Sequence, residues 1–159
     1  AHWLSDITPA NFHTIDYNLI PEAPGAFEAL RELNKMFGGN VTVVYKATDV
    51  ATEKILAWIE YHEFVRRTGL PISRVIRTSD GRNKTRHIDQ SSETHCGTTI
   101  VVDDRLEVMS HFVGKGVPNL FLFHPQTEEV QQFRHTGALA HCRIVQTWQE
   151  IMSIIRAQP

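Results

Sequence analysis

Two adjacent carboxylates, Asp103 and Asp104, end the apolar, β-branched run that begins at residue 98, and they are the residues best suited to chemistry. A short run of this kind is typical of a strand that is buried on both faces. In open α/β sheets, ligands bind beyond the carboxyl ends of such strands. Carboxylates suit Mg²⁺, which takes one or two of them and fills its shell with substrate oxygens and water. The sequence therefore predicts a metal site at Asp103 and Asp104.

A structural role for the same pair stays open. Aspartate is favoured as a helix N-cap, and a second carboxylate is favoured in the first turn by the helix dipole. A short amphipathic helix is predicted directly afterwards, with an apolar face formed by Leu106, Val108, Met109, Phe112 and Val113. Gly116 and a second buried strand at Leu120–Phe123 complete a unit of strand, acidic turn, helix and strand. Arg105 either pairs with the acidic turn or contacts substrate.

Strands and helices are predicted to alternate along the rest of the chain. The expected elements are a strand at 12–15 ending at Asp16, a helix from Phe27 closed by Gly38-Gly39, a strand at 41–44, a long helix from about Asp49 to Thr68, a strand at 73–77, a weak helix at 84–91, a polar loop at 124–142, a strand at 143–145 and a terminal helix from Trp148. This alternation predicts an α/β fold with one doubly wound parallel sheet, in a single domain over residues 1–159.

Composition excludes several classes of function. The chain is 42% hydrophobic and 21% charged, which is ordinary for a globular protein, and its formal charge of -2 gives no nucleic-acid signature. No apolar stretch approaches the roughly 20 residues that cross a bilayer, and no signal-peptide pattern begins the chain. We therefore expect a cytoplasmic or organelle-matrix protein with no membrane contact. Cys96 and Cys142 are expected to be reduced.

If the predicted strands are parallel, four separate segments end at one edge of the sheet. They are Asp16, Tyr45-Lys46, the polar loop at 78–84 and the acidic pair. Their carboxylates, hydroxyls and ammonium groups suit a hard cation together with a phosphate.

Over residues 12–125 the chain resembles the haloacid dehalogenase superfamily, whose members are mostly Mg²⁺-dependent phosphatases on a doubly wound α/β domain. In that family an acidic pair follows the fourth strand, and Asp103 and Asp104 match it within Val101–Arg105. A glycine and an apolar strand come next in the family, as Gly116 and the following strand do here. The resemblance implies that Asp103 binds Mg²⁺, that Asp104 orders the metal shell, and that Lys84 steadies the phosphoryl oxygens.

The first motif of the family is Asp-x-Asp-Gly-Thr/Val, and the closest segment here is Asp16-Tyr17-Asn18-Leu19-Ile20. The resemblance implies that Asp16 is the nucleophile and a metal ligand, and it places Asn18 where the family has its general acid and base. Asparagine cannot shuttle a proton. The rate enhancement of about 10²–10⁴-fold that a positioned acid or base gives would therefore be lost or supplied by another group. Two alternatives remain: Asp6 is the second acid, with Leu4 in place of the nucleophile, or the motif lies upstream of Ala1.

The second motif of the family is a Ser or Thr that binds the phosphoryl group, and Tyr45 stands at that position, with Thr48 as a substitute.

Two functions are therefore expected. One is a weakened Mg²⁺-dependent phosphomonoester hydrolase, capless or minimally capped, whose open crevice suits phosphorylated macromolecules or a lid from a partner subunit. The other is a catalytically inactive binding or scaffolding module. A dinucleotide-binding domain is disfavoured because no Gly-x-Gly-x-x-Gly follows an early strand.

Overall fold

The computed structural model describes residues 15–78 and 98–159, and the chain forms two compact units, Ala1–Ser79 and Asp80–Pro159. Both units are mixed α/β, and every strand pair in the described residues is parallel. The sheets have two and three strands, so the predicted α/β class is confirmed. The single doubly wound sheet and the single domain stay predictions. No helix in the described ranges is long and apolar enough to cross a membrane.

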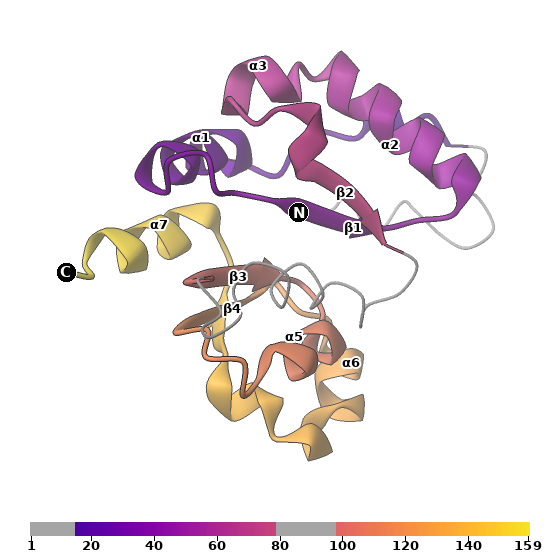
Figure 1. Cartoon of the computed structure of the whole chain (residues 1–159). Helices are drawn as coiled ribbons and strands as arrows, with labels where there is room; N and C mark the ends of the chain where they lie inside the picture. The colour runs from indigo at the N-terminus through magenta and orange to yellow at the C-terminus, as the bar shows by residue number, and fades with distance from the viewer. Residues whose placement is uncertain (1–14, 79–97) are drawn as a thin grey trace. The chain divides into compact units, whose positions relative to one another are not determined.

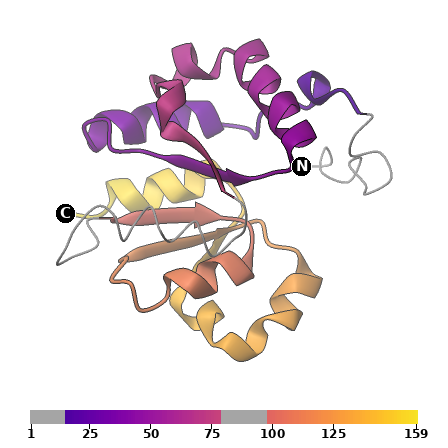
Figure 2. The same ribbon diagram turned by 45° about the vertical axis from the view of Figure 1, so that its right-hand side comes forward.

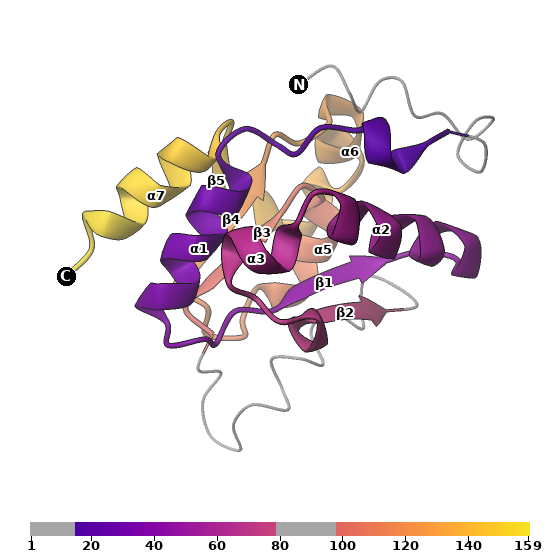
Figure 3. The same cartoon turned by 90° about the horizontal axis from the view of Figure 1, so that it is seen from above.

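The first unit is a pair of strands with helices on one side (Figure 1). Its elements are η2 Tyr17–Leu19, α1 Ala26–Met36, β1 Val43–Lys46, α2 Asp49–Tyr61, α3 Phe64–Thr68, η3 Ile72–Arg74 and β2 Val75–Thr78. β1 pairs with β2 from Val43↔Val75 to Lys46↔Thr78. Figure 3 shows α2 lying along this strand pair. An aromatic core joins α1 to α3, because the Phe27 ring meets the Phe64 ring edge-on at 5.2 Å.

Two glycine-dependent turns end helices in the first unit. Gly38-Gly39 follows α1 with φ of 60° and 87°, which confirms the predicted helix end. Gly69 follows α3 with φ of 80°, and its carbonyl accepts a hydrogen bond from the Asn34 side chain at 3.4 Å. Glycine adopts this left-handed conformation without the steric cost that a Cβ imposes.

Gly69→Ala is expected to destabilise the first unit by about 2 kcal/mol, because left-handed backbone costs an L-residue about 1–2 kcal/mol and crowding adds to it. A Cβ at Gly69 would lie 3.2 Å from Asn34 Nδ2. Gly39→Ala is the matched control, since its φ is 87° and no atom lies within 4 Å of a Cβ there. Chemical denaturation measures both variants. Equal losses would show that the contact with Asn34 adds nothing.

The long helix predicted from Asp49 to Thr68 is interrupted. α2 ends at Tyr61, and Glu63 takes a left-handed conformation with φ of 55° before α3 begins. The hydrogen bonds and charge of Arg66 lower the pKa of the Glu63 carboxyl. The apolar periodicity continues through this break, so it gave no signal of a bend. After this break α3 packs on α1, where the Phe64 ring meets the Phe27 ring.

The second unit has helices on both faces of a three-stranded sheet, with α7 on one side and α5 and α6 on the other (Figure 2). Its elements are β3 Ile100–Asp103, α5 Leu106–Phe112, β4 Asn119–Phe123, α6 Thr127–Gln132, η5 Arg134–Thr136, η6 Ala138–His141, β5 Arg143–Val145 and α7 Trp148–Arg156. The strand order is β3-β4-β5. Leu120 and Leu122 pack in the core beneath α5, while Phe121, also fully buried, alternates to the opposite face.

Most predicted elements of the second unit are confirmed, and two expectations are corrected. The polar loop predicted at 124–142 contains α6 and two 3₁₀ helices instead, because Val130, Phe133 and Leu139 pack against the core. β3 is only half-buried along its length, so the strand buried on both faces is β4. Of the strand predicted at 12–15, only Ile15 is described, and it lies in a bend. The weak helix predicted at 84–91 lies outside the described residues.

Candidate functional site

The acidic turn follows β3, at the edge of the sheet where the sequence predicts it. Asp103 is the last residue of β3 and lies beside Leu122 of β4, and Asp104 is exposed. The backbone N–H of Arg105 donates to Asp103 Oδ1 at 3.0 Å. α5 begins at Leu106, so Arg105 takes the N-cap position and Glu107 the first turn. The alternative in which Asp103 is the helix N-cap is therefore wrong.

Arg105 connects the acidic turn to two helices. Its guanidinium pairs with Glu107 of α5 at 2.6 Å and with Glu129 of α6 at 3.3 Å. The Glu129 side chain is only 14% exposed, so this second pair is shielded from solvent more than a surface pair. Arg105 thus fixes the turn between β3 and α5 against α6. Of the two roles expected for Arg105, the structure shows an ion pair. Its partners Glu107 and Glu129 belong to α5 and α6 and not to the acidic turn.

The other parallel strands of this unit end at the same edge as Asp103. His124 follows β4 in a left-handed conformation with φ of 43°, and its N–H donates to the Val145 carbonyl at 2.8 Å. Thr147 follows β5 and caps α7 by accepting from the Glu150 N–H at 3.1 Å. A non-glycine residue with positive φ is strained, and such strain gathers at functional sites. No pattern in the sequence marks His124 for this conformation.

In the first unit, Tyr45 and Thr48 lie at the carboxyl end of β1. Tyr45 is half-buried within β1, and Thr48 is the N-cap of α2, where its hydroxyl accepts from the Ala51 N–H at 3.2 Å. Arg77 secures this connection by donating to the Ala47 carbonyl at 2.9 Å and pairing with Asp49 at 2.6 Å. The Thr48 hydroxyl therefore has a structural role already, and its predicted contact with phosphate stays a prediction.

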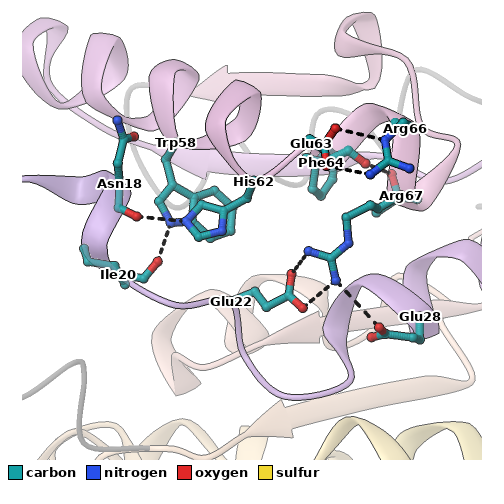
Figure 4. A network of polar contacts seen from close by, with 11 residues as sticks. Asn18, Ile20, Glu22, Glu28, Trp58, His62, Glu63, Phe64, Arg66 and Arg67 are labelled. Atoms are coloured by element: carbon teal, nitrogen blue, oxygen red, sulfur yellow. Dashed lines mark hydrogen bonds and ion pairs between the residues drawn. The ribbon is translucent and has the colours of Figure 1, made fainter.

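Asn18 belongs to a turn that is held against the side of α2 (Figure 4), and Asp16 is the N-cap residue of this turn. The Asp16 carboxylate caps η2 by accepting from the Asn18 N–H at 3.0 Å. From α2, Lys54 and Trp58 donate to the carbonyls of Ile15 and Ile20, each at 2.8 Å. His62 Nε2 lies 3.1 Å from the Asn18 carbonyl. Three side chains spaced one helical turn apart thus fix this segment through its backbone.

The structure does not bring Asn18 to Thr48. His62, which contacts Asn18, follows the C-terminal end of α2, whereas Thr48 precedes its N-terminal end. A helix of 13 residues is about 20 Å long at about 1.5 Å per residue. Asp16 also begins a 3₁₀ helix and is not the end of a described strand. Asn18 and Thr48 therefore lie at opposite ends of α2, and the catalytic roles of Asp16 and Asn18 stay predictions.

The remaining site residues divide between the two units and the undescribed ranges. Asp16 belongs to the first unit, and Asp103 and Asp104 belong to the second, so the predicted metal set draws on both. Lys84, Asp6 and Cys96 lie outside the described residues. Within the described ranges, no group of three or more His, Cys, Asp and Glu side chains could hold a metal ion.

Burial raises the pKa of the Cys142 thiol, which keeps it protonated at neutral pH.

Comparisons of the chain with protein-family models, with curated proteins and with solved structures find no match. The resemblance to the haloacid dehalogenase superfamily therefore rests on the residues themselves, chiefly Asp103, Asp104 and the elements around them.

Proposed function

We propose that this chain is a Mg²⁺-dependent phosphomonoester hydrolase of the haloacid dehalogenase type, with a doubly wound fold that is capless or minimally capped. One observation carries the proposal: Asp103 ends a parallel strand and Asp104 follows it, at the sheet edge where α/β proteins bind ligands. The Arg105 N–H holds Asp103 Oδ1, which orients the carboxylate without removing its charge. Because the Asp103 carboxylate is already held in place, it loses little conformational entropy when it binds a cation.

Each of the other proposed roles follows from the chemistry of the side chain. Asp103 and Asp16 would hold Mg²⁺, which would neutralise charge on the phosphoryl oxygens. Asp16 would attack phosphorus and form an aspartyl phosphate, which water would then hydrolyse to release phosphate. In the first step the ester P–O bond would break, and the leaving oxygen would need a proton. Asn18 cannot supply that proton, so we expect only phosphates with acidic leaving groups, such as aryl phosphates, to react at a useful rate. Lys84 would balance the charge of the phosphate.

A second candidate function is a non-catalytic module that binds a phosphorylated partner or a cation. Two contacts favour it. The Asp16 carboxylate and the Thr48 hydroxyl each accept a backbone N–H in a cap, which is a structural use of groups that catalysis would need. Asn18 and Thr48 also lie at opposite ends of α2.

Hydrolysis of p-nitrophenyl phosphate, with and without Mg²⁺, tests the proposed function. We expect Mg²⁺-dependent turnover that Asp103→Asn lowers by about 100-fold or more, since a catalytic metal supplies several kcal/mol of transition-state stabilisation. Glu128→Gln, an exposed change on α6, is the matched control and should retain the rate. An equal rate in Asp103→Asn and wild type would refute the assignment.

Thermal unfolding distinguishes the second candidate from the first. If Mg²⁺ raises the melting temperature of the wild type but not of Asp103→Asn, and no phosphate ester is hydrolysed, the chain binds the cation without catalysis. If turnover is present and Asp16→Asn does not change it, the nucleophile is another residue.

A further inference from the structure

The outward face of α2 carries apolar side chains that no part of the described chain covers. Its inner face is buried through Ala51 and Ile59, at 1% and 7% exposure, and its flank binds residues 15–20. On the outward side, Val50 is 48% exposed, Leu56 41% and Tyr61 63%. η2, which is held against the C-terminal end of α2, adds Leu19 at 78% exposure. The exposed apolar residues therefore lie along the whole helix.

α2 differs in this respect from the two helices of similar length, α1 and α7. Those helices gather their buried residues on one side and are polar on the other, as expected for helices at a surface. α2 has apolar residues on both sides, and a helix of that kind is normally covered on both. Large exposed apolar side chains that lie together mark interaction sites, and tyrosine is enriched in them.

A row of carboxylates runs along the outward face of α2, with Val50 and Tyr61 on one side of it and Leu56 on the other. Asp49, Glu53 and Glu60 lie on one exposed face of α2, because 3.6 residues per turn place positions four and eleven apart in line. Arg77 pairs with Asp49, whereas Glu53 and Glu60 form no ion pair within the described residues. Lys54 is the single basic residue of α2, and it lies on the flank, where it donates to the Ile15 carbonyl. The outward face is thus apolar and negatively charged.

We propose that this face of α2, formed by Val50, Glu53, Leu56, Glu60 and Tyr61, docks a cationic amphipathic helix of a partner protein. Such a helix would place apolar residues, spaced three and four apart, on Val50 and Tyr61, and lysine or arginine on Glu53 and Glu60. Opposite charges would steer the encounter and set the orientation, and Tyr61 would supply most of the buried contact. The negative charge disfavours an anionic membrane, which attracts basic segments. It also disfavours a second copy of the same face.

Fluorescence anisotropy of the full chain with a labelled peptide, LKKLLKLLKKLLKL, tests the surface. This peptide forms a helix with leucine on one side and lysine on the other, and LEELLELLEELLEL is its charge-inverted control. We expect the lysine peptide to bind and the glutamate peptide not to bind. Binding should weaken by about 10-fold in the Glu53→Lys/Glu60→Lys double variant and by about 10-fold in Tyr61→Ser, as for residues central to an interface.

The matched control is Glu128→Lys/Glu150→Lys, which changes the net charge equally at exposed residues of α6 and α7. It should alter affinity by less than about 2-fold, because salt screens exposed charges that do not contact the peptide. Circular dichroism confirms that each variant is folded. Equal weakening in both double variants, or no binding of the lysine peptide, would overturn the proposal. So would a dimer of the chain, or binding to phosphatidylcholine vesicles, that Tyr61→Ser abolishes.

Discussion

Phe121→Ala is expected to destabilise the second unit by about 3–5 kcal/mol, the usual cost of truncating a buried phenylalanine. Phe121 is fully buried in the middle of β4, between Val102 of β3 and Arg143 of β5. Its loss would leave a cavity on the face of the sheet opposite Leu120 and Leu122. Because whole domains are stable by only about 5–15 kcal/mol, we expect a fraction of this unit to be unfolded at 37 °C.

Urea denaturation followed by circular dichroism measures this loss. Ile144→Ala on β5 is the control, since Ile144 is 49% exposed and its truncation should cost less than about 1 kcal/mol. Similar losses for Phe121→Ala and Ile144→Ala would show that β4 is not the centre of a packed sheet.

Trp58→Ala is expected to destabilise the first unit by about 3–5 kcal/mol, because this side chain combines packing with a hydrogen bond. The Trp58 ring meets the Phe27 ring edge-on at 5.8 Å and lies 4.5 Å from the His62 ring. Its Nε1 donates to the Ile20 carbonyl. Removing Trp58 would therefore release residues 15–20 from α2 as well as loosen the contact with α1.

Trp58→Phe separates the two contributions, because it keeps an aromatic ring and removes the N–H donor. We expect it to cost about 1 kcal/mol, the net value of a typical hydrogen bond. Hydrogen exchange of the Leu19 and Ile20 amides reports the release of the segment directly. Unchanged exchange in Trp58→Ala would mean that Lys54 and His62 suffice to hold it.

The sequence determined the order of most elements because their patterns are local. The β-branched runs before Asp103 and around Val43 form strands, and the apolar spacing after Trp148 forms α7. Helix ends at glycine were predictable because the left-handed conformation favours that residue. The acidic pair was also placed correctly at the end of β3, since alternation with helices implies parallel strands.

Tertiary structure decided the features that depend on contacts distant in the sequence. A strand was expected at residues 12–15, ending at Asp16, whereas hydrogen bonds from Lys54, Trp58 and His62 hold residues 15–20 against α2. The break at Glu63 and the helices after Phe123 likewise come from packing, which periodicity along the chain does not encode. A motif such as Asp16-Tyr17-Asn18 can be read from the sequence as a pattern of residue types. Its position depends on carbonyl groups and on their partners about 40 residues away, and only the folded chain supplies these.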